Sequence, residues 1–262
     1  MDVLTFLGTA CGIPMADRFP SSILLNAGGR RWLLDAGEPC SQRLRALGVP
    51  FSSLDAIFIS HGHSDHLSGL PMIIQGAWLE ARRTPLPLYL PAELIAPIRT
   101  WLEAVYLPEK LVGFPLEFHA WEKLPGGVAT LEDGELRVSV NPSTHLDSLR
   151  AVIDPGAADR FLAYSIVYDW KGKRLIYSAD LGRPEDLSPI LDRPCDLLVC
   201  ELAHYEPEEL FAFLADKPVR RVCLTHLTAE FAARADEICE LGRRILPRVE
   251  IAAMTDGTRV EF

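Results

Sequence analysis

The segment His61-Gly62-His63-Ser64-Asp65-His66 concentrates side chains that can bind a metal ion. Three of the chain's seven histidines and one aspartate fall within these six residues. Imidazole nitrogens and carboxylate oxygens are ligands that zinc, manganese and iron ions accept in proteins. A lone loop histidine is usually a solvated or structural residue, but four donors at this spacing favour a divalent metal site. The sequence therefore predicts metal-assisted chemistry at this segment.

The segment lies between an apolar run, Ala56–Ser60, and a longer amphipathic run, Leu67–Glu80. These patterns predict a strand followed by a helix, and a tight turn after a strand end can aim several short side chains at one point. Similar runs predict α/β layers, and no linker interrupts them, so we expect one domain over residues 1–262. Further strands are predicted at Val3–Leu7, Ser22–Ala27, Arg31–Asp35, Leu86–Leu90, Leu136–Val140, Ala163–Tyr168, Arg174–Ser178, Leu197–Glu201, Arg221–Thr225 and Glu250–Met254, with His119 also in a strand. Further helices are predicted at Ser41–Leu47, Leu94–Val105, Pro207–Leu214 and Thr228–Leu246, and a turn at Asp133-Gly134.

The composition is that of a folded, acidic protein. With 48% hydrophobic and 24% charged residues in 262, the chain is not disordered, because it can bury a sizeable core. Lys plus Arg is 26 and Asp plus Glu is 36, so the net charge is 26 − 36 = −10, which disfavours a protein that coats nucleic acid. The six cysteines form no C-x-x-C pair, and neither a signal peptide nor an 18-residue apolar stretch is visible. We therefore expect a cytoplasmic protein with reduced thiols and no membrane partner.

The H-x-H-x-D-H segment, between an apolar strand and Leu-x-Gly-Leu, resembles the metallo-β-lactamase superfamily. Four later or earlier positions match the same family in order: Asp35 in Trp32–Glu38, His145 after Thr144, Asp180 in Tyr177–Asp180 and His226 in Leu224–His226. Within the superfamily, Phe6–Pro14 with Ser21-Ser22, and Asp196–Glu201, are similar to the branch of ribonuclease Z, which processes tRNA 3′ ends. The resemblance covers residues 1–260.

This resemblance implies an αββα sandwich that holds two divalent metal ions, Zn²⁺ or alternatively Mn²⁺ or Fe²⁺. It assigns His61, His63 and His145 to one ion, and Asp65, His66 and His226 to the other, with Asp180 bridging both. A hydroxide shared by the metals would then attack the substrate, and Asp65 counts among the catalytic residues as well. Each later position has a plainer alternative: a turn residue at His145, a helix cap for 182–191 at Asp180, a surface residue at His226.

Asp35 is expected to orient a histidine through a hydrogen bond and not to bind metal itself. The alternative is a helix cap near Glu38–Ser41. The chain departs from the endonuclease at the proton donor, because Cys200 stands where the His-Glu-Ala-Thr motif has its histidine. We expect Glu201 and His204 to act in catalysis, with His204 protonating the leaving group. A surface loop histidine is the alternative for His204.

The substrate expectation follows from what the chain lacks. The candidate insertions, Thr84–Lys110 and Ser148–Arg160, contain no long basic arm, and the four arginine pairs are scattered. A surface that grips tRNA needs several phosphate contacts. We therefore expect a phosphodiesterase for a small or nucleotide-type substrate. The alternatives are a tRNA 3′-processing endoribonuclease and a non-catalytic metal-binding relative, and the resemblance also implies a homodimer.

Overall fold

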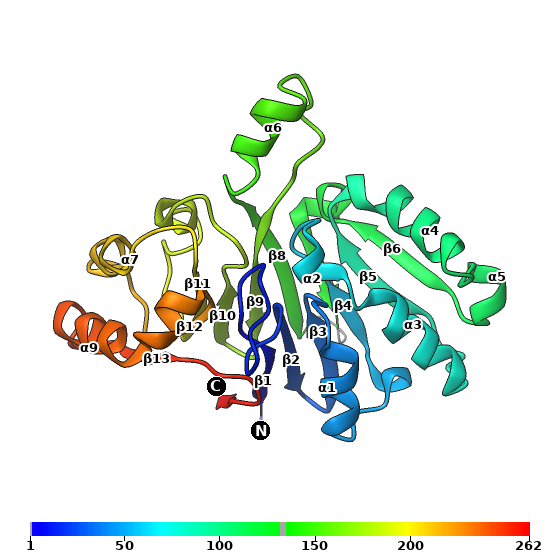
Figure 1. The fold of residues 1–262 in the computed structure, drawn as a ribbon, viewed down its shortest axis with the longest axis horizontal. Coiled ribbons are helices and arrows are strands. Elements are labelled where there is room, and N and C mark those ends of the chain that lie inside the picture. The colour runs from blue at the N-terminus through cyan, green and yellow to red at the C-terminus, as the bar shows by residue number, and fades with distance from the viewer. Residues whose placement is uncertain (1, 132–134) are drawn as a thin grey trace. The chain divides into compact units, whose positions relative to one another are not determined.

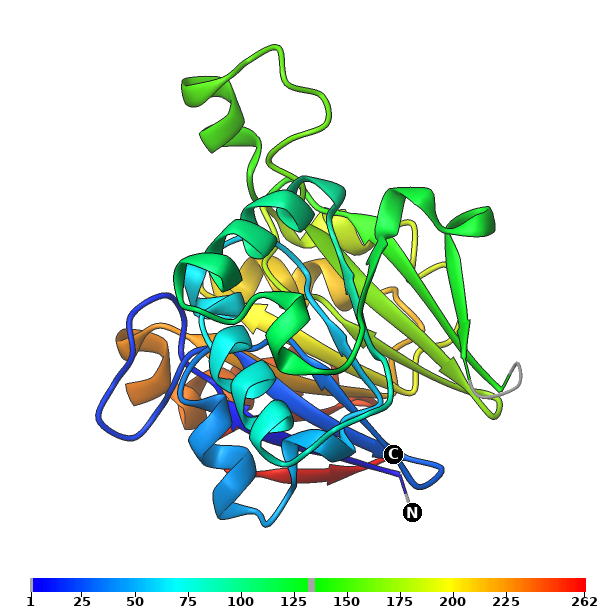
Figure 2. The same ribbon diagram turned by 90° about the vertical axis from the view of Figure 1, so that its right-hand side faces the viewer.

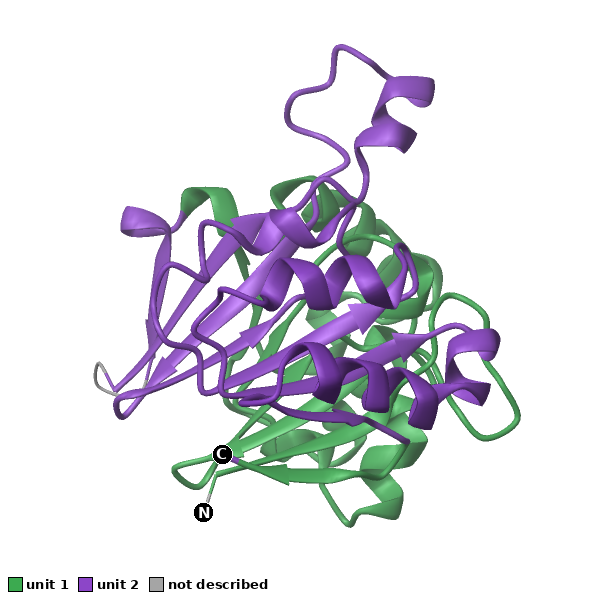
Figure 3. Ribbon diagram, turned by 90° about the vertical axis from the view of Figure 1, so that its left-hand side faces the viewer, with its two compact units in different colours: residues 1–123, 256–261 green, residues 124–255, 262 purple. Residues whose placement is uncertain are grey.

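The computed structural model describes residues 2–131 and 135–262, so the turn predicted at Asp133-Gly134 lies outside the described residues. The chain forms two compact units (Figure 3). Unit 1 contains residues 1–123 and 256–261, and unit 2 contains residues 124–255 and 262. The expectation of one domain over the whole chain stays a prediction.

Unit 1 is built on a seven-stranded mixed sheet. Its strand order is β14 (Arg259–Glu261), β1 (Val3–Gly8), β2 (Ser22–Ala27), β3 (Arg30–Leu34), β4 (Ala56–Phe58), β5 (Leu86–Leu90) and β6 (Leu116–Ala120). Pairs from β14 to β3 are antiparallel and pairs from β3 to β6 are parallel. The helices are α1 (Cys40–Ala46), α2 (Ser64–Leu67), α3 (Leu70–Leu79), α4 (Ile95–Ala104) and α5 (Glu109–Val112). Helices α3 and α4 lie along one face of this sheet (Figure 2), where Ile73 and Ile98 pack with Leu33, Ile57 and Leu88 in a buried cluster.

Unit 2 repeats the same arrangement of strand directions. Its strand order is β7 (Val128–Leu131), β8 (Leu136–Pro142), β9 (Tyr164–Trp170), β10 (Lys173–Tyr177), β11 (Leu197–Leu202), β12 (Arg221–Leu227) and β13 (Glu250–Ala253). Pairs from β7 to β10 are antiparallel and pairs from β10 to β13 are parallel. The helices are α6 (Asp147–Ile153), α7 (Pro207–Leu214), α8 (Ala229–Ala233) and α9 (Ala235–Ile245). Leu210 and Ile238 of α7 and α9 join Ile176, Leu198 and Leu224 in its core, whereas α6 projects away from the unit 2 sheet (Figure 1).

Within each sheet, the strand directions place the polar loops at the end where the parallel strands have their carboxyl ends. In each unit, three antiparallel pairs are followed by three parallel pairs, so the parallel set begins at the fourth strand of the order, β3 in unit 1 and β10 in unit 2. Asp35 directly follows β3, and Asp180 lies three residues after β10. Ligands of α/β proteins bind outside the carboxyl ends of parallel strands, which is where both residues lie.

Most predicted elements are present, and two predicted helices are divided. The helix expected at Leu67–Glu80 is split at Gly69, where an added Cβ would come within 2.8 Å of the Ala36 carbonyl oxygen, so the backbone passes too close for a side chain. The helix expected at Thr228–Leu246 is divided at Arg234, whose φ of −108° leaves the helical range, and Thr228 caps α8 by accepting the Phe231 N–H at 3.1 Å. His119 lies in β6 as predicted. Strands β7 and β14 and helices α5 and α6 were not predicted.

Among the residues that the structure describes, no helix combines the length and the apolar character that a bilayer span requires.

Candidate metal centre

Unit 1 brings together the four donors of the H-x-H-x-D-H segment. His61 follows β4, His63 immediately precedes α2, and Asp65 and His66 lie in α2 itself. The ring centroid of His61 is 4.9 Å from that of His63 and 4.2 Å from that of His66. His66 Nε2 lies 3.4 Å from Asp65 Oδ2. His61 and His66 are fully buried, so this cluster is part of the folded core of unit 1 and not a solvated loop.

Asp35 fixes the orientation of two of these histidines. Its Oδ2 lies 2.7 Å from His66 Nδ1 and 2.8 Å from Ser60 Oγ, and Ser60 Oγ lies 3.0 Å from His61 Nδ1. An ionised carboxylate only accepts hydrogen bonds, so His66 Nδ1 and Ser60 Oγ are the donors to it. Because the Ser60 proton is then used, His61 Nδ1 donates to the serine oxygen. In both rings Nε2 is therefore unprotonated, and its lone pair points away from Asp35. A metal ion binds a histidine through such an unprotonated nitrogen.

The backbone around Asp35 holds this arrangement in place. Asp35 has φ 53°, a left-handed conformation that is rare for residues other than glycine. Its carboxylate also accepts the Ser60 N–H at 2.8 Å, and the next residue, Ala36, donates to the His66 carbonyl at 2.7 Å. An added Cβ at Gly37 would overlap the Asp65 carbonyl oxygen. The alternative of a cap by Asp35 on α1 is not what the structure shows, because Pro39 occupies the cap position without a side-chain bond.

Unit 2 brings together His145, Asp180 and His226. Asp180 Oδ2 lies 3.3 Å from His226 Nε2 and 3.5 Å from His145 Nε2. The side chains of all three are at least 93% buried. His226 is near the end of β12 with φ 53°, and Ala179, before Asp180, has φ 48°. Non-glycine residues in this conformation cluster at functional sites, where surrounding contacts hold the strain.

Asp186 ties the loops of His145 and Asp180 together, and nothing in the sequence pattern singled it out. Its Oδ2 accepts the Thr144 N–H at 2.9 Å and the Gly182 N–H at 3.0 Å, and it also accepts the Thr144 hydroxyl. Ser143 Oγ adds a bond of 2.9 Å to the Asp180 carbonyl. A lone aspartate in a Pro-Glu-Asp turn carries no spacing signal, so its role is visible only once the fold places both loops beside it.

Glu201 and His204 form a hydrogen-bonded pair next to these residues. His204 Nδ1 lies 2.8 Å from Glu201 Oε1, and the buried carboxylate also accepts the backbone N–H groups of Leu181 and Ala203. The His204 ring centroid is 4.6 Å from that of His145 and 6.0 Å from that of His226. The His204 side chain is 35% exposed and contributes to the lining of a pocket in unit 2.

Cys200 is oriented differently from its neighbour Glu201. Its thiol lies 3.5 Å from the Tyr205 hydroxyl within the apolar core of unit 2. Burial raises the pKa of the Cys200 thiol to about 12. The cysteine that stands in the histidine position of the endonuclease motif is therefore a core residue and a poor proton donor.

A pocket of about 500 Å³ lies beside the unit 2 residues. Its lining includes His145, His204, Thr144 and the exposed Arg183, whose Nε is 3.7 Å from Asp186 Oδ1. A volume of this size suits a small molecule or one nucleotide unit. Asp147 also lines the pocket, so the lining combines one guanidinium with one carboxylate.

The donor sets of the two units fit divalent metal ions. Unit 1 supplies three imidazoles and one carboxylate, and unit 2 supplies two imidazoles and one carboxylate. Buried imidazoles held by a carboxylate through the opposite ring nitrogen are the usual ligands of zinc and related ions. Asp35, Asp180 and Glu201 are buried carboxylates, and a buried negative charge is stabilised by a nearby cation.

The comparisons with known proteins point the same way. A family profile described as "Beta-lactamase superfamily domain" matches residues 30–246. Ribonuclease Z of Pseudomonas putida (strain KT2440) is 30% identical over 275 residues, covering 88% of this chain and 86% of the relative. The chain belongs to the metallo-β-lactamase superfamily, in its ribonuclease Z-like branch.

Solved structures of the superfamily share the fold. The metallo-β-lactamase fold protein YhfI from Bacillus subtilis has a TM-score of 0.77 at 19% identity, covering 100% of this chain and 99% of that one. The short form of human tRNase Z has a TM-score of 0.73 at 20% identity, with the same coverage. The predicted α/β metallo-β-lactamase fold is thus confirmed. This member of the superfamily is a metal-dependent hydrolase of ester bonds, as predicted.

Proposed function

We propose that this hydrolase is a dinuclear metal-dependent phosphodiesterase for a small or nucleotide-type substrate. The observation that carries the proposal is the donor set: five histidines and two aspartates, presented at or near the carboxyl ends of β4, β8, β10 and β12 in a chain of the ribonuclease Z-like branch. Two-metal hydrolases of phosphate esters use such sets, with one carboxylate shared between the ions.

The proposed division of ligands follows the superfamily. In that division, His61, His63 and His145 would hold one ion, Asp65, His66 and His226 would hold the other, and Asp180 would serve both. When bound, two divalent ions, which we propose to be zinc, supply Lewis-acid activation of the phosphate and of the attacking water. Asp35 would not bind metal itself. It holds His66 directly, and His61 through Ser60, in the tautomer that binds metal.

His204 is the proposed proton donor to the leaving group. Glu201 accepts the proton of His204 Nδ1 and so directs Nε2 outward from the carboxylate. A buried carboxylate stabilises the protonated imidazole, which is the form that can donate. Two backbone N–H groups hold Glu201 in place, so the acid is positioned before substrate binds. Proton donation matters most for an alkoxide leaving group, such as a ribose hydroxyl.

The preference for a small substrate depends on the surroundings of the pocket in unit 2. The pocket has room for about one nucleotide, and Arg183 is the cation in its lining. The projecting segment that includes α6 exposes Leu149, Val152 and Ile153 and carries no basic cluster. A long RNA would need several phosphate contacts beyond the pocket.

One observation favours a second candidate function, 3′ processing of tRNA. The relative from Pseudomonas putida, which this chain matches over most of its length, is named ribonuclease Z. The two functions predict different substrates for the same metal-binding residues.

A substrate panel with metal analysis tests both. We expect about two divalent ions per chain by elemental analysis, and turnover of bis(p-nitrophenyl) phosphate and a dinucleotide with slow cleavage of 3′-extended pre-tRNA. Efficient cutting of pre-tRNA at one position would replace the first function by the second. Two bound metals without turnover of any phosphodiester would contradict both. The homodimer and the cytoplasmic location stay predictions.

A further inference from the structure

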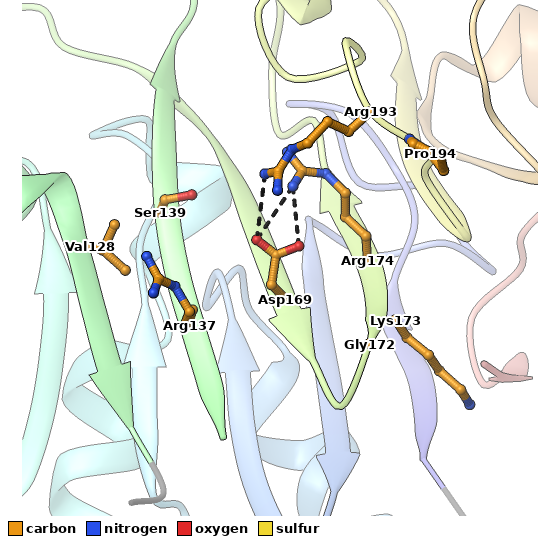
Figure 4. A pocket seen from close by; sticks show the side chains of 9 residues that line it. All are labelled: Val128, Arg137, Ser139, Asp169, Gly172, Lys173, Arg174, Arg193 and Pro194. Carbon is orange, nitrogen blue, oxygen red and sulfur yellow. Dashed lines mark hydrogen bonds and ion pairs between the residues drawn. The ribbon is translucent and has the colours of Figure 1, made fainter. Parts of the chain in front are cut away.

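A second pocket in unit 2, of about 590 Å³, is lined by basic side chains (Figure 4). It involves the solvent-facing side of β8 and the turn between β9 and β10. The lining residues that matter here are Arg137, Asp169, Arg174 and Arg193, with Val128 and Pro194 as apolar walls.

The pocket is separate from the metal centre. Arg137 is near the beginning of β8 and Pro142 ends that strand, before His145. Five residues of strand span about 17 Å. A ligand in this pocket therefore contacts none of the metal-binding side chains of unit 2, and the site needs its own explanation.

Three guanidinium groups surround one carboxylate there. In the strand register, Asp169 of β9 lies opposite Arg137 on one side and opposite Arg174 on the other. Arg174 Nη1 lies 3.1 and 3.3 Å from the two Asp169 oxygens, and Arg193 Nη2 lies 3.8 Å from Oδ2. The local sum is 3 − 1 = +2 in a chain whose net charge is −10.

Two of the three arginines keep donors for a ligand. Arg174 is nearly buried and held by Asp169 and by the Ile190 carbonyl, so it is a fixed part of the wall. Arg193 has a side chain 61% exposed, and its nearest carboxylate oxygens, at 3.8 and 3.9 Å, are beyond hydrogen-bond distance. Arg137 is exposed and makes no hydrogen bond or ion pair with residues 2–131 or 135–262. Figure 4 shows Arg137 on one side of the pocket and Arg193 on the other, whereas the Lys173 side chain points away.

We propose that this pocket binds the phosphate groups of a nucleotide. Guanidinium groups bind phosphate oxygens with two parallel hydrogen bonds, and arginines on opposite walls suit a diphosphate better than a single charge. The volume lies within the range of small-molecule sites, and Val128 and Pro194 give apolar surface for the nucleoside. The site does not depend on the proposed phosphodiesterase function, because it shares no residue with the metal centre.

Titration calorimetry on the metal-loaded protein, with ADP, pyrophosphate and adenosine as probes, tests the proposal. Because phosphates also bind metals, the Asp180→Asn variant serves to identify binding at the metal centre. We expect ADP to bind Asp180→Asn with unchanged affinity at the basic pocket, pyrophosphate to bind more weakly, and adenosine not to bind.

The double variant Arg137→Gln/Arg193→Gln should weaken ADP binding at this pocket at least tenfold. Arg244→Gln, which removes an exposed charge of α9 outside the pocket, is the matched control and should change it less than twofold. Turnover of bis(p-nitrophenyl) phosphate should be unaffected in both, and thermal unfolding checks that both fold.

Four results would overturn the proposal. The first is equal ADP affinity in the wild type and the double variant, and the second is loss of all ADP binding in Asp180→Asn. The third is equal affinity for pyrophosphate and ADP. The fourth is tighter binding of an RNA oligomer without terminal phosphates than of ADP. The last two would replace the nucleotide by a bare anion or by a nucleic-acid backbone.

Discussion

Glu201 Oε1 lies 2.8 Å from His204 Nδ1, and the same carboxylate accepts two backbone N–H groups. A residue three positions after a buried glutamate thus takes a defined orientation beside His145 and His226. Cys200, in the histidine position of the endonuclease motif, packs into the core instead. The acid function that we propose for His204 therefore has a different source in the sequence, four residues after Cys200.

Substitution His204→Gln should affect substrates according to their leaving group. For a dinucleotide, whose ribose alkoxide must be protonated, we expect a fall in kcat of about 10²–10⁴-fold. For bis(p-nitrophenyl) phosphate we expect little change, because p-nitrophenolate leaves without a proton. Steady-state kinetics on both substrates measures the difference. Cys200→Ala is the control and should lower neither rate; equal losses of His204→Gln on both substrates would contradict the acid role.

Substitution Asp180→Asn should remove most activity together with bound metal. Replacing a residue that only hydrogen-bonds to a metal ligand already lowers metal affinity or activity about 10–100-fold. Loss of a shared ligand should therefore lower activity more than about 100-fold. Elemental analysis and kcat/KM are the measurements. Asp192→Asn removes a carboxylate from the same unit whose side chain is 64% exposed, and it should leave both quantities unchanged. Near-normal rates with two metals retained in Asp180→Asn would refute the ligand assignment.

Substitution Asp35→Asn should weaken metal binding without removing any ligand. An amide at this position can donate to His66 Nδ1 and shift the ring proton to Nε2, where the metal would bind. We expect affinity to fall about 10–100-fold in a chelator competition. Ser60→Ala should have a smaller effect through His61. Asp256→Asn, which removes a carboxylate that contacts Thr9 and Phe19 in the same unit, should retain wild-type affinity; parallel losses in both aspartate variants would indicate general destabilisation.

Substitution Gly182→Ala should disturb the His145 loop. An added Cβ would overlap Thr144 Oγ1 and lie 2.8 Å from the Thr144 carbonyl carbon, so the loop has to move. Overpacking of this kind costs about 1–3 kcal/mol of unfolding free energy. Chemical denaturation and metal content check both effects. Gly156→Ala meets nothing within 4 Å and should behave as wild type; if the two variants are equally stable, the close approach at Gly182 does not matter.

The sequence predicts those parts of the molecule whose signals are local. The H-x-H-x-D-H segment, its preceding strand and the helix Pro207–Leu214 are in the structure where the residue patterns place them. Strand β14 is only three residues long, and β7 has four, so neither carries enough alternation to be recognised. The breaks at Gly69 and Arg234 come from contacts and dihedral angles that no periodicity records.

The residues that orient the candidate metal ligands are likewise difficult to predict from the sequence. Asp35 was identified because it matches a family position, but its link to His61 through Ser60 needs the actual geometry. Asp186 joins two loops that are about forty residues apart in sequence, and Arg137 meets Asp169 only through strand pairing. Such relations arise from tertiary contacts between distant segments, so composition and spacing do not contain them.

The last strand has a consequence for how the chain folds during synthesis. Strand β14 pairs with β1, and Gly257 N–H donates to the Phe6 carbonyl, so the edge of the unit 1 sheet is closed by residues 256–261. A ribosome has therefore already made all of unit 2 up to residue 255 before the residues that complete unit 1 exist. The part of unit 1 that is made first therefore waits for residues 256–261, and its exposed β1 edge is open to wrong pairing until those residues have been made.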